Sequence, residues 1–358
     1  MKIGIITYFD VPNYGSVFLS YAMQKTLEEM GHVPVFLRYK RQKETPIRSN
    51  NLKRKLKNYS PHTLLANREE KKKERLICKF RERNLTIGDY YNISQGLDII
   101  VVGSDQIFDC KYEFNNYQYA IGASCDHIIS YAPSFGEFSY SDLSIFNHIE
   151  ELKTALSRFE IHSARDDNTV ELLENLTGNR PVRVLDPVLL YGFDKEKNQW
   201  NKELIQEQYL IIYTWGGITV SAEFAEQVKA FARKHKMKTV SVGDYRPWCD
   251  YHFASASPVT FFRLFQHSEM VITNMFHGTC FSILHEKPFY SLIMPHNHNK
   301  VADLLRHFKL DCCCIDTLDG LRDKDIPLWN VSDVNKQLKF ERCSSMEFLS
   351  KAIGISNT

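Results

Sequence analysis

Residues 270–289, MVITNMFHGTCFSILHEKPF, decide the fold class of this chain. Apolar and β-branched residues fill positions 270–273, so this segment predicts a short buried strand. The strand ends in a Thr-Asn pair, and His277-Gly278 then opens a helical pattern. A strand, a polar turn and a helix in this order form one unit of a parallel α/β sheet.

Strands and helices alternate in the same way through both halves of the chain. The N-terminal half opens with an apolar run at residues 3–8, followed by a helical pattern that continues through Leu27. Further strands are expected at 98–102, 128–131, 159–161, 209–215, 239–242 and 289–294, and further helices at 222–234, 258–267, 278–285 and 301–308. This alternation predicts an α/β fold of two domains, each with a parallel sheet covered by helices on both faces.

A polar, charged stretch at residues 192–208 is the expected linker between the two domains. The predicted division is therefore an N-terminal domain at 1–191, a C-terminal domain at 209–340, and a C-terminal helix and tail at 341–358. Ser344 is the expected N-cap of that helix, because a serine hydroxyl accepts hydrogen bonds from the free N–H groups of a first turn.

The composition is that of a globular protein, with 43% of the 358 residues hydrophobic and 25% charged. No apolar run approaches the roughly 20 residues that span a bilayer, and the N-terminus lacks signal-peptide features, so we expect a cytoplasmic protein. The nine cysteines form no CxxC pair, which favours reduced thiols, and residues 312–314 are expected to form a short buried strand. His296 and His298 lack a third ligand at supporting spacing, so no metal site is predicted.

The positive charge of the chain is concentrated in residues 38–83, the basic segment, which we expect to be a helical insert in the N-terminal domain. The segment holds 17 Lys and Arg against five Asp and Glu, whereas the whole chain has a formal net charge of +2. Few aromatic residues are interspersed, so stacked single-stranded nucleic acid fits poorly. Anionic lipid head groups or a phosphorylated acceptor fit better, and the alternative is a solvated helix without a specific partner.

Polar loops follow several of the expected strands. They lie at residues 13–16, 103–106, 132–136 and 163–166. In open parallel sheets ligands bind at the carboxyl ends of strands, so these loops predict one crevice. His277 follows a strand in the other domain, where an imidazole at a helix N-terminus can give or take a proton near neutral pH.

These motifs together resemble the polysaccharide pyruvyl transferase family, over nearly the whole chain. The matching blocks are KIGIITY at 2–8 with NYGS at 13–16, VGSDQ at 102–106, SYAPSFG at 130–136, ARD at 164–166, DPVLL at 186–190, and TNMFHGT at 273–279 with KPF at 287–289. The resemblance implies a GT-B-like fold, with two Rossmann-like domains facing across a cleft. It also implies transfer of a pyruvyl group from phosphoenolpyruvate onto two hydroxyls of a sugar, giving a ketal and phosphate, in the synthesis of a capsule, exopolysaccharide or cell-wall glycan.

The resemblance also suggests roles for individual residues. His277 would be the general acid and base or a phosphate contact, and Arg165 and Lys300 would hold the donor, with Gly278 and Asn274 beside them. The residues expected to bind the acceptor, placed on the strand-end loops, are Asn13, Tyr14, Gly15, Asp105 and Ser134. Asp186 is expected either to orient an acceptor hydroxyl or to be a turn residue before Pro187. No cofactor beyond the substrate phosphoenolpyruvate is implied, and the acceptor is expected to be a sugar or a lipid-linked oligosaccharide, with peripheral membrane contact through the basic segment and no nucleic acid.

Met275 departs from the family pattern, since many members carry an arginine two residues before the histidine. The departure predicts that the cation comes from elsewhere, or that the donor differs. One alternative is therefore a GT-B glycosyltransferase that uses a nucleotide sugar, because His277-Gly278 with Glu286 and Pro288 is also similar to the ribose-binding region of such enzymes. Another is a non-catalytic paralogue that binds a glycan or acts as a scaffold.

Overall fold

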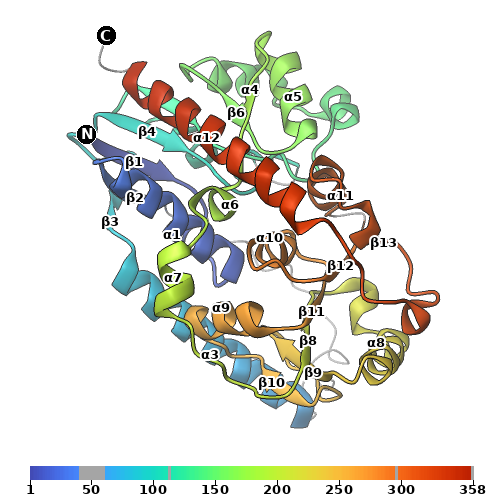
Figure 1. Ribbon diagram of the computed structural model, residues 1–358. Helices are drawn as coiled ribbons and strands as arrows, with labels where there is room; N and C mark the ends of the chain where they lie inside the picture. Colours follow the sequence, from blue (N-terminus) through green and yellow to red (C-terminus); the bar gives the residue numbers. More distant parts are fainter. Residues whose placement is uncertain (40–60, 112–113, 295–296, 356–358) are drawn as a thin grey trace, which may run out of the picture.

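The computed structural model describes residues 1–39, 61–111, 114–294 and 297–355. Within these residues two parallel sheets form the framework (Figure 1). The N-terminal sheet has the order β3 (Ile87–Tyr90), β2 (Val33–Arg38), β1 (Lys2–Ile6), β4 (Ile99–Val102) and β5 (Ile128–Ser130). The C-terminal sheet has the order β10 (Tyr251–Phe253), β9 (Lys238–Val242), β8 (Tyr209–Tyr213), β11 (Met270–Thr273), β12 (Phe289–Leu292) and β13 (Cys314–Ile315), and a small sheet pairs β6 (Ser163–Ala164) with β7 (Val182–Arg183). The prediction of an α/β fold with two Rossmann-like domains is confirmed.

The central strands are short, continuous apolar runs because helices cover both faces of each sheet. All four residues of β4 and all four of β11 are buried. The described helices are α1 (Tyr14–Glu29), α3 (Pro61–Asn84), α4 (Ile149–Leu156), α5 (Asp167–Thr177), α6 (Pro187–Tyr191), α7 (Asp194–Gln199), α8 (Ala222–Lys234), α9 (Pro258–His267), α10 (Phe276–Leu284), α11 (His298–His307) and α12 (Val331–Ile355). Short 3₁₀ turns lie at Tyr117–Tyr119, Tyr140–Ile145, Gly217–Val220, Asp311–Cys313 and Leu321–Asp323.

The C-terminal helix α12 is longer than the sequence predicts. It begins at Val331, where the side chain of Asn330 accepts a hydrogen bond from the Asp333 N–H at 3.2 Å, so the predicted N-cap at Ser344 was wrong. The next serine, Ser345, is buried within the helix, and its hydroxyl accepts a hydrogen bond from the Leu185 N–H at 3.0 Å. The helix thus returns from the C-terminal domain and packs against the N-terminal one (Figure 1).

The expected strand at residues 312–314 is only partly present. A 3₁₀ turn covers Asp311–Cys313, and the two-residue strand β13 begins at Cys314. Cys313 is buried, whereas Cys312 is exposed. The apolar character of the triplet predicted burial, but the turn places only part of it in the core.

The two domains share one continuous hydrophobic core around α1, α6, α9 and α10. Phe18 of α1 lies at its centre, with its ring centroid 4.9 Å from that of Phe281. The predicted linker contributes to this core: it contains helix α7, and Trp200 packs edge-on against Phe262 at 5.1 Å. The stretch therefore contributes an aromatic contact to the core, although its composition is mostly polar.

Candidate functional site

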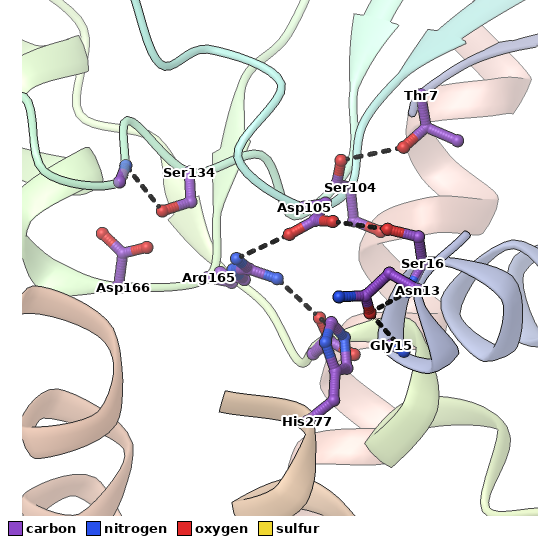
Figure 2. Close-up of polar contacts among 12 residues, drawn as sticks. Thr7, Asn13, Gly15, Ser16, Ser104, Asp105, Ser134, Arg165, Asp166 and His277 are labelled. Atoms are coloured by element: carbon purple, nitrogen blue, oxygen red, sulfur yellow. Dashed lines mark hydrogen bonds and ion pairs between the residues drawn. The ribbon is translucent and has the colours of Figure 1, made fainter. Parts of the chain in front are cut away.

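The site is centred on Arg165, which follows strand β6 and is 6% exposed. Its Nη1 donates to Asp186 Oδ2 at 2.8 Å, and its Nη2 lies 3.4 Å from Asp105 Oδ1. The ring of Phe276, at the start of α10, lies 4.4 Å from the guanidinium carbon. Figure 2 shows Arg165 between the loop that carries Asp105 and the helix that carries His277.

His277, in the first turn of α10, reaches the same carboxylate from the other domain. Its Nε2 lies 3.7 Å from Asp186 Oδ2, the oxygen that also accepts from Arg165. On the other side of the ring, Gly15 approaches so closely that a Cβ there would lie 2.2 Å from His277 Nδ1. Glycine is therefore required at position 15, and the imidazole is held between Gly15 and Asp186.

The two carboxylate oxygens of Asp186 make different contacts. Oδ1 accepts from the Val188 N–H at 3.0 Å and caps helix α6, while Oδ2 faces Arg165 and His277. The expectation of a turn residue is confirmed. The role that sequence reasoning missed is the ionic one, which joins groups far apart in the chain.

Asp105 joins the strand-end loops of the N-terminal domain. Its Oδ2 accepts from the Ser16 hydroxyl at 3.1 Å, and its backbone carbonyl accepts from the Ser134 N–H at 2.8 Å. The side chain of Asn13 caps α1 by accepting from the Gly15 N–H at 2.7 Å (Figure 2). Ser134 accepts from the Gly136 N–H at 3.0 Å, so the predicted acceptor residues Asn13, Gly15, Asp105 and Ser134 lie in one connected group of loops.

The charges of the site keep its carboxylates ionised. Burial alone would raise the pKa of Asp186, but the charges of His277 and Arg165 outweigh it, and the pKa lies below its usual range. Burial likewise acts to raise the pKa of Asp105, and Arg165, His277 and Lys300 bring it below the ordinary value. Burial acts to lower the pKa of Arg165, yet its two carboxylate partners raise it above normal, so the guanidinium stays charged.

Lys300 is brought to this cluster by helix α11. Burial lowers the pKa of Lys300, the charge of Arg165 lowers it further, and Asp105 opposes both. The helix is tied to the N-terminal domain at two places. Asn299 donates to the Gly136 carbonyl at 3.3 Å, and Arg183 Nη2 lies 2.6 Å from Asp303 Oδ2. The two predicted donor cations, Arg165 and Lys300, are thus neighbours although they come from different domains.

Three predicted site residues also make structural contacts. The Asn274 amide donates to the Trp215 carbonyl and accepts from the Trp215 N–H, both at 2.8 Å, so it joins the ends of β11 and β8. Gly278 packs so closely on Thr273 that a Cβ would lie 2.2 Å from its Oγ1. Tyr14 is buried between the domains, and its hydroxyl donates to the Ala256 carbonyl at 2.7 Å.

Tyr14→Phe is expected to lower the free energy of unfolding by about 1 kcal/mol, because the buried carbonyl of Ala256 loses its donor while the ring stack on Phe261 remains. Denaturant unfolding measures this change. The acceptor KM should stay unchanged, since the hydroxyl is engaged in the interdomain contact. A raised acceptor KM at unaltered stability would return Tyr14 to the acceptor site.

Comparison with known proteins assigns the family. A family model described as polysaccharide pyruvyl transferase matches residues 13–295. The chain belongs to this family. It is therefore a transferase that modifies polysaccharides.

No curated protein matches the chain by sequence. Among solved structures, the kitacinnamycin glycotransferase is 12% identical with a TM-score of 0.49, and 98% of each chain is covered. The UDP-GlcNAc 2-epimerase from Methanocaldococcus jannaschii is 11% identical with a TM-score of 0.48, covering 95% of this chain and 99% of the other. The spinosyn rhamnosyltransferase SpnG is 11% identical with a TM-score of 0.43, covering 99% and 96%.

Met275, the predicted departure from the family pattern, is the N-cap residue of α10. Its N–H donates to Thr273 Oγ1 at 3.0 Å, and its side chain, partly buried, packs against the core and makes no capping hydrogen bond. Of the HxH pair, His298 begins α11 and His296 lies outside the described residues. In the part of the chain that the structure describes, no three His, Cys, Asp or Glu side chains are grouped to hold a metal ion.

Proposed function

We propose that this family member transfers a pyruvyl group from phosphoenolpyruvate onto two hydroxyls of a sugar, in the assembly of a capsule, exopolysaccharide or cell-wall glycan. The observation that carries the proposal is the single carboxylate oxygen of Asp186, which faces Arg165 of one domain and His277 of the other. It places a fixed guanidinium and an imidazole within one ionic group. That combination suits a donor that must be bound as an anion and protonated on carbon.

The chemistry follows from this arrangement. His277 in its protonated form gives a proton to the methylene carbon of phosphoenolpyruvate, and the central carbon becomes oxocarbenium-like. A sugar hydroxyl adds to that carbon and loses its proton to the then neutral imidazole. Phosphate leaves with its bonding electrons, and the second hydroxyl attacks the same carbon and gives its proton to the released phosphate, which closes the ketal. Histidine suits both steps because it exchanges protons near neutral pH.

The charge balance indicates which groups meet the donor. Arg165 already faces two ionised carboxylates, Asp105 and Asp186, so it contributes no net positive charge to an incoming anion. Lys300 and the protonated form of His277 supply that charge, together with the N–H groups at the start of α10. Arg165 then acts by directed hydrogen bonds to the carboxylate or phosphate of the donor rather than by excess charge.

Phosphate release from phosphoenolpyruvate by purified protein, over a panel of sugar acceptors, tests the proposal. We expect release that depends on the acceptor and that falls in Arg165→Lys and Lys300→Met variants. Arg306→Met is a matched control, because Arg306 is an exposed cation at the other end of α11. Saturation by a nucleotide sugar, with no release from phosphoenolpyruvate, would contradict the proposal and support a glycosyltransferase.

Met275→Arg is expected to lower the KM for phosphoenolpyruvate by about tenfold, because it adds a cation at the N-terminus of α10, where an anion is favoured. Met275→Leu is the matched control, since it keeps the packing of the side chain without a charge. The measurement is the KM for the donor at fixed acceptor. Equal KM values in the two variants would place the donor away from α10.

We further propose that the acceptor sugar is carried on an anionic lipid, with the enzyme at the inner face of the plasma membrane. The support is the charge of the basic segment, 17 Lys and Arg against five Asp and Glu. Among the described residues no helix is long and apolar enough to cross a bilayer. Comparing kcat/KM for a lipid-linked acceptor and its soluble sugar tests the carrier, and equal values would contradict it.

A further inference from the structure

Helix α3 is held in a fixed orientation across both domains. Its inner face buries Ile77 and Phe80 in the shared core. Arg81 Nη1 donates to the Asp10 carbonyl at 2.9 Å, in the loop that leads to α1, and Lys73 Nζ donates to the Gly243 carbonyl of the C-terminal domain at 3.0 Å. Figure 1 shows α3 beside α9, at the rim of the molecule. The opposite face of the helix is therefore presented to solvent as a rigid surface.

That outer face carries a stripe of exposed cations. They recur three or four residues apart, which places them on one side of a helix. The members are Arg68, Lys71, Lys72, Arg75, Lys79 and Arg83. Two carboxylates, Glu74 and Glu82, are exposed along the same side, and Glu70 pairs with Lys73 at 2.6 Å. The stripe keeps an excess of positive charge.

Two exposed leucines extend the stripe toward the start of the helix. Leu64 is 54% exposed and Leu65 is 37% exposed. At an anionic bilayer, exposed apolar side chains next to cations add burial of apolar area to the electrostatic attraction. No aromatic side chain is exposed along the described part of α3, so the stripe offers no platform on which the bases of a single strand could stack.

We propose that the outer face of α3 docks on an anionic phospholipid surface, with Leu64 and Leu65 inserted at its edge. The purpose of this contact rests on the proposed function, because docking would bring a lipid-linked acceptor to the enzyme. Arg81 joins the inner face of the helix to the loop before Asn13, so the docked face has a constant position relative to the acceptor loops. Binding itself needs no catalysis and is measured separately.

Co-sedimentation of the full chain with vesicles tests the docking. We expect binding to phosphatidylcholine mixed with phosphatidylglycerol, weakening as salt rises, and little binding to phosphatidylcholine alone. The variant K71E/K72E/R75E/K79E should bind the anionic vesicles at least about tenfold more weakly, since each cation near such a surface contributes roughly fivefold. Leu64→Ser with Leu65→Ser should also weaken binding.

The matched control reverses four exposed cations elsewhere, R180E/K195E/K336E/K351E, and so changes the net charge equally. It should retain vesicle binding. Equal loss in both variants, equal binding to neutral vesicles, or tighter binding to single-stranded DNA than to anionic vesicles would overturn the proposal. The α3 variant should release phosphate with a soluble acceptor as the wild type does. If the proposed pyruvyl transfer is wrong, neither protein will release phosphate. If only the docking proposal is wrong, both proteins will release phosphate and the vesicle assay alone will show the failure.

Discussion

His277→Gln is expected to lower acceptor-dependent phosphate release by about 10²- to 10⁴-fold, the range that general acid–base groups contribute. Glutamine retains a side chain that can form hydrogen bonds between Gly15 and Asp186 but cannot carry a proton to carbon. The loss should fall on kcat more than on the KM for the donor, because Arg165 and Lys300 remain. Initial rates measured over a range of phosphoenolpyruvate concentrations separate the two constants.

A matched control is His252→Gln, which changes an exposed histidine on β10 of the same domain. It should leave kcat and KM as they are. A His277→Gln enzyme with full activity would remove His277 from the chemistry and support a binding role for the chain.

The alternation of the fold and most central strands were predictable because their signals are local. The expected strand at 159–161 is instead an isolated bridge at Ile161, and β2, β3 and β10 were not predicted. Strand β11 has the predicted bounds, since four adjacent apolar residues suffice to indicate a buried strand. The start of α12 could not be predicted from the sequence, because Ser344 and Asn330 are both residue types that cap helices. Only the buried contact of Ser345 with Leu185, 160 residues away, distinguishes them.

The site was predictable in its residue types but less so in its contacts. Arg165 and His277 follow strand ends, and parallel sheets bring such positions together. Asp186 was expected as a turn residue or a partner of the acceptor. Its ion pair with Arg165 joins residues 21 positions apart, so no local pattern indicates it. Tyr14 begins α1 and Asn274 follows β11, at positions expected to bind ligands. Their polar groups join the two domains and two strands.

Asp186→Asn is expected to lower the free energy of unfolding by about 3–5 kcal/mol, the cost of removing one partner from a buried ion pair. The side chains of Asp186 and Arg165 are 1% and 2% exposed, and the substitution leaves the guanidinium with the longer ion pair to Asp105, at 3.4 Å. Activity should fall as well, because Arg165 and His277 lose the charge that fixes both. Denaturant unfolding and initial rates measure the two effects.

The double variant D186N/R165M distinguishes two causes of the lost stability: an uncompensated buried charge on Arg165, or altered packing around position 186. If the stranded guanidinium causes the instability, removing it should restore part of the lost free energy, so the double variant should be more stable than Asp186→Asn. An additive loss would instead assign the effect to packing. Neither outcome should restore activity, since the double variant lacks the group proposed to hold the donor.

The pH dependence of stability gives an independent measure of the same ion pair. The pKa of Asp186 is lowered in the folded protein, so its contribution is complete above the unfolded value of about 3.9 and is lost as the pH falls through the folded pKa. The wild type should therefore lose stability steeply below about pH 4. Asp186→Asn should lose less over that interval, because an amide takes up no proton and only Asp105 still titrates between Arg165 and the strand-end loops. If the free energy of unfolding fell equally in the two proteins as the pH is lowered, Asp186 would contribute no ionic stabilisation. The site would then be held together by packing around Phe276 and Gly15.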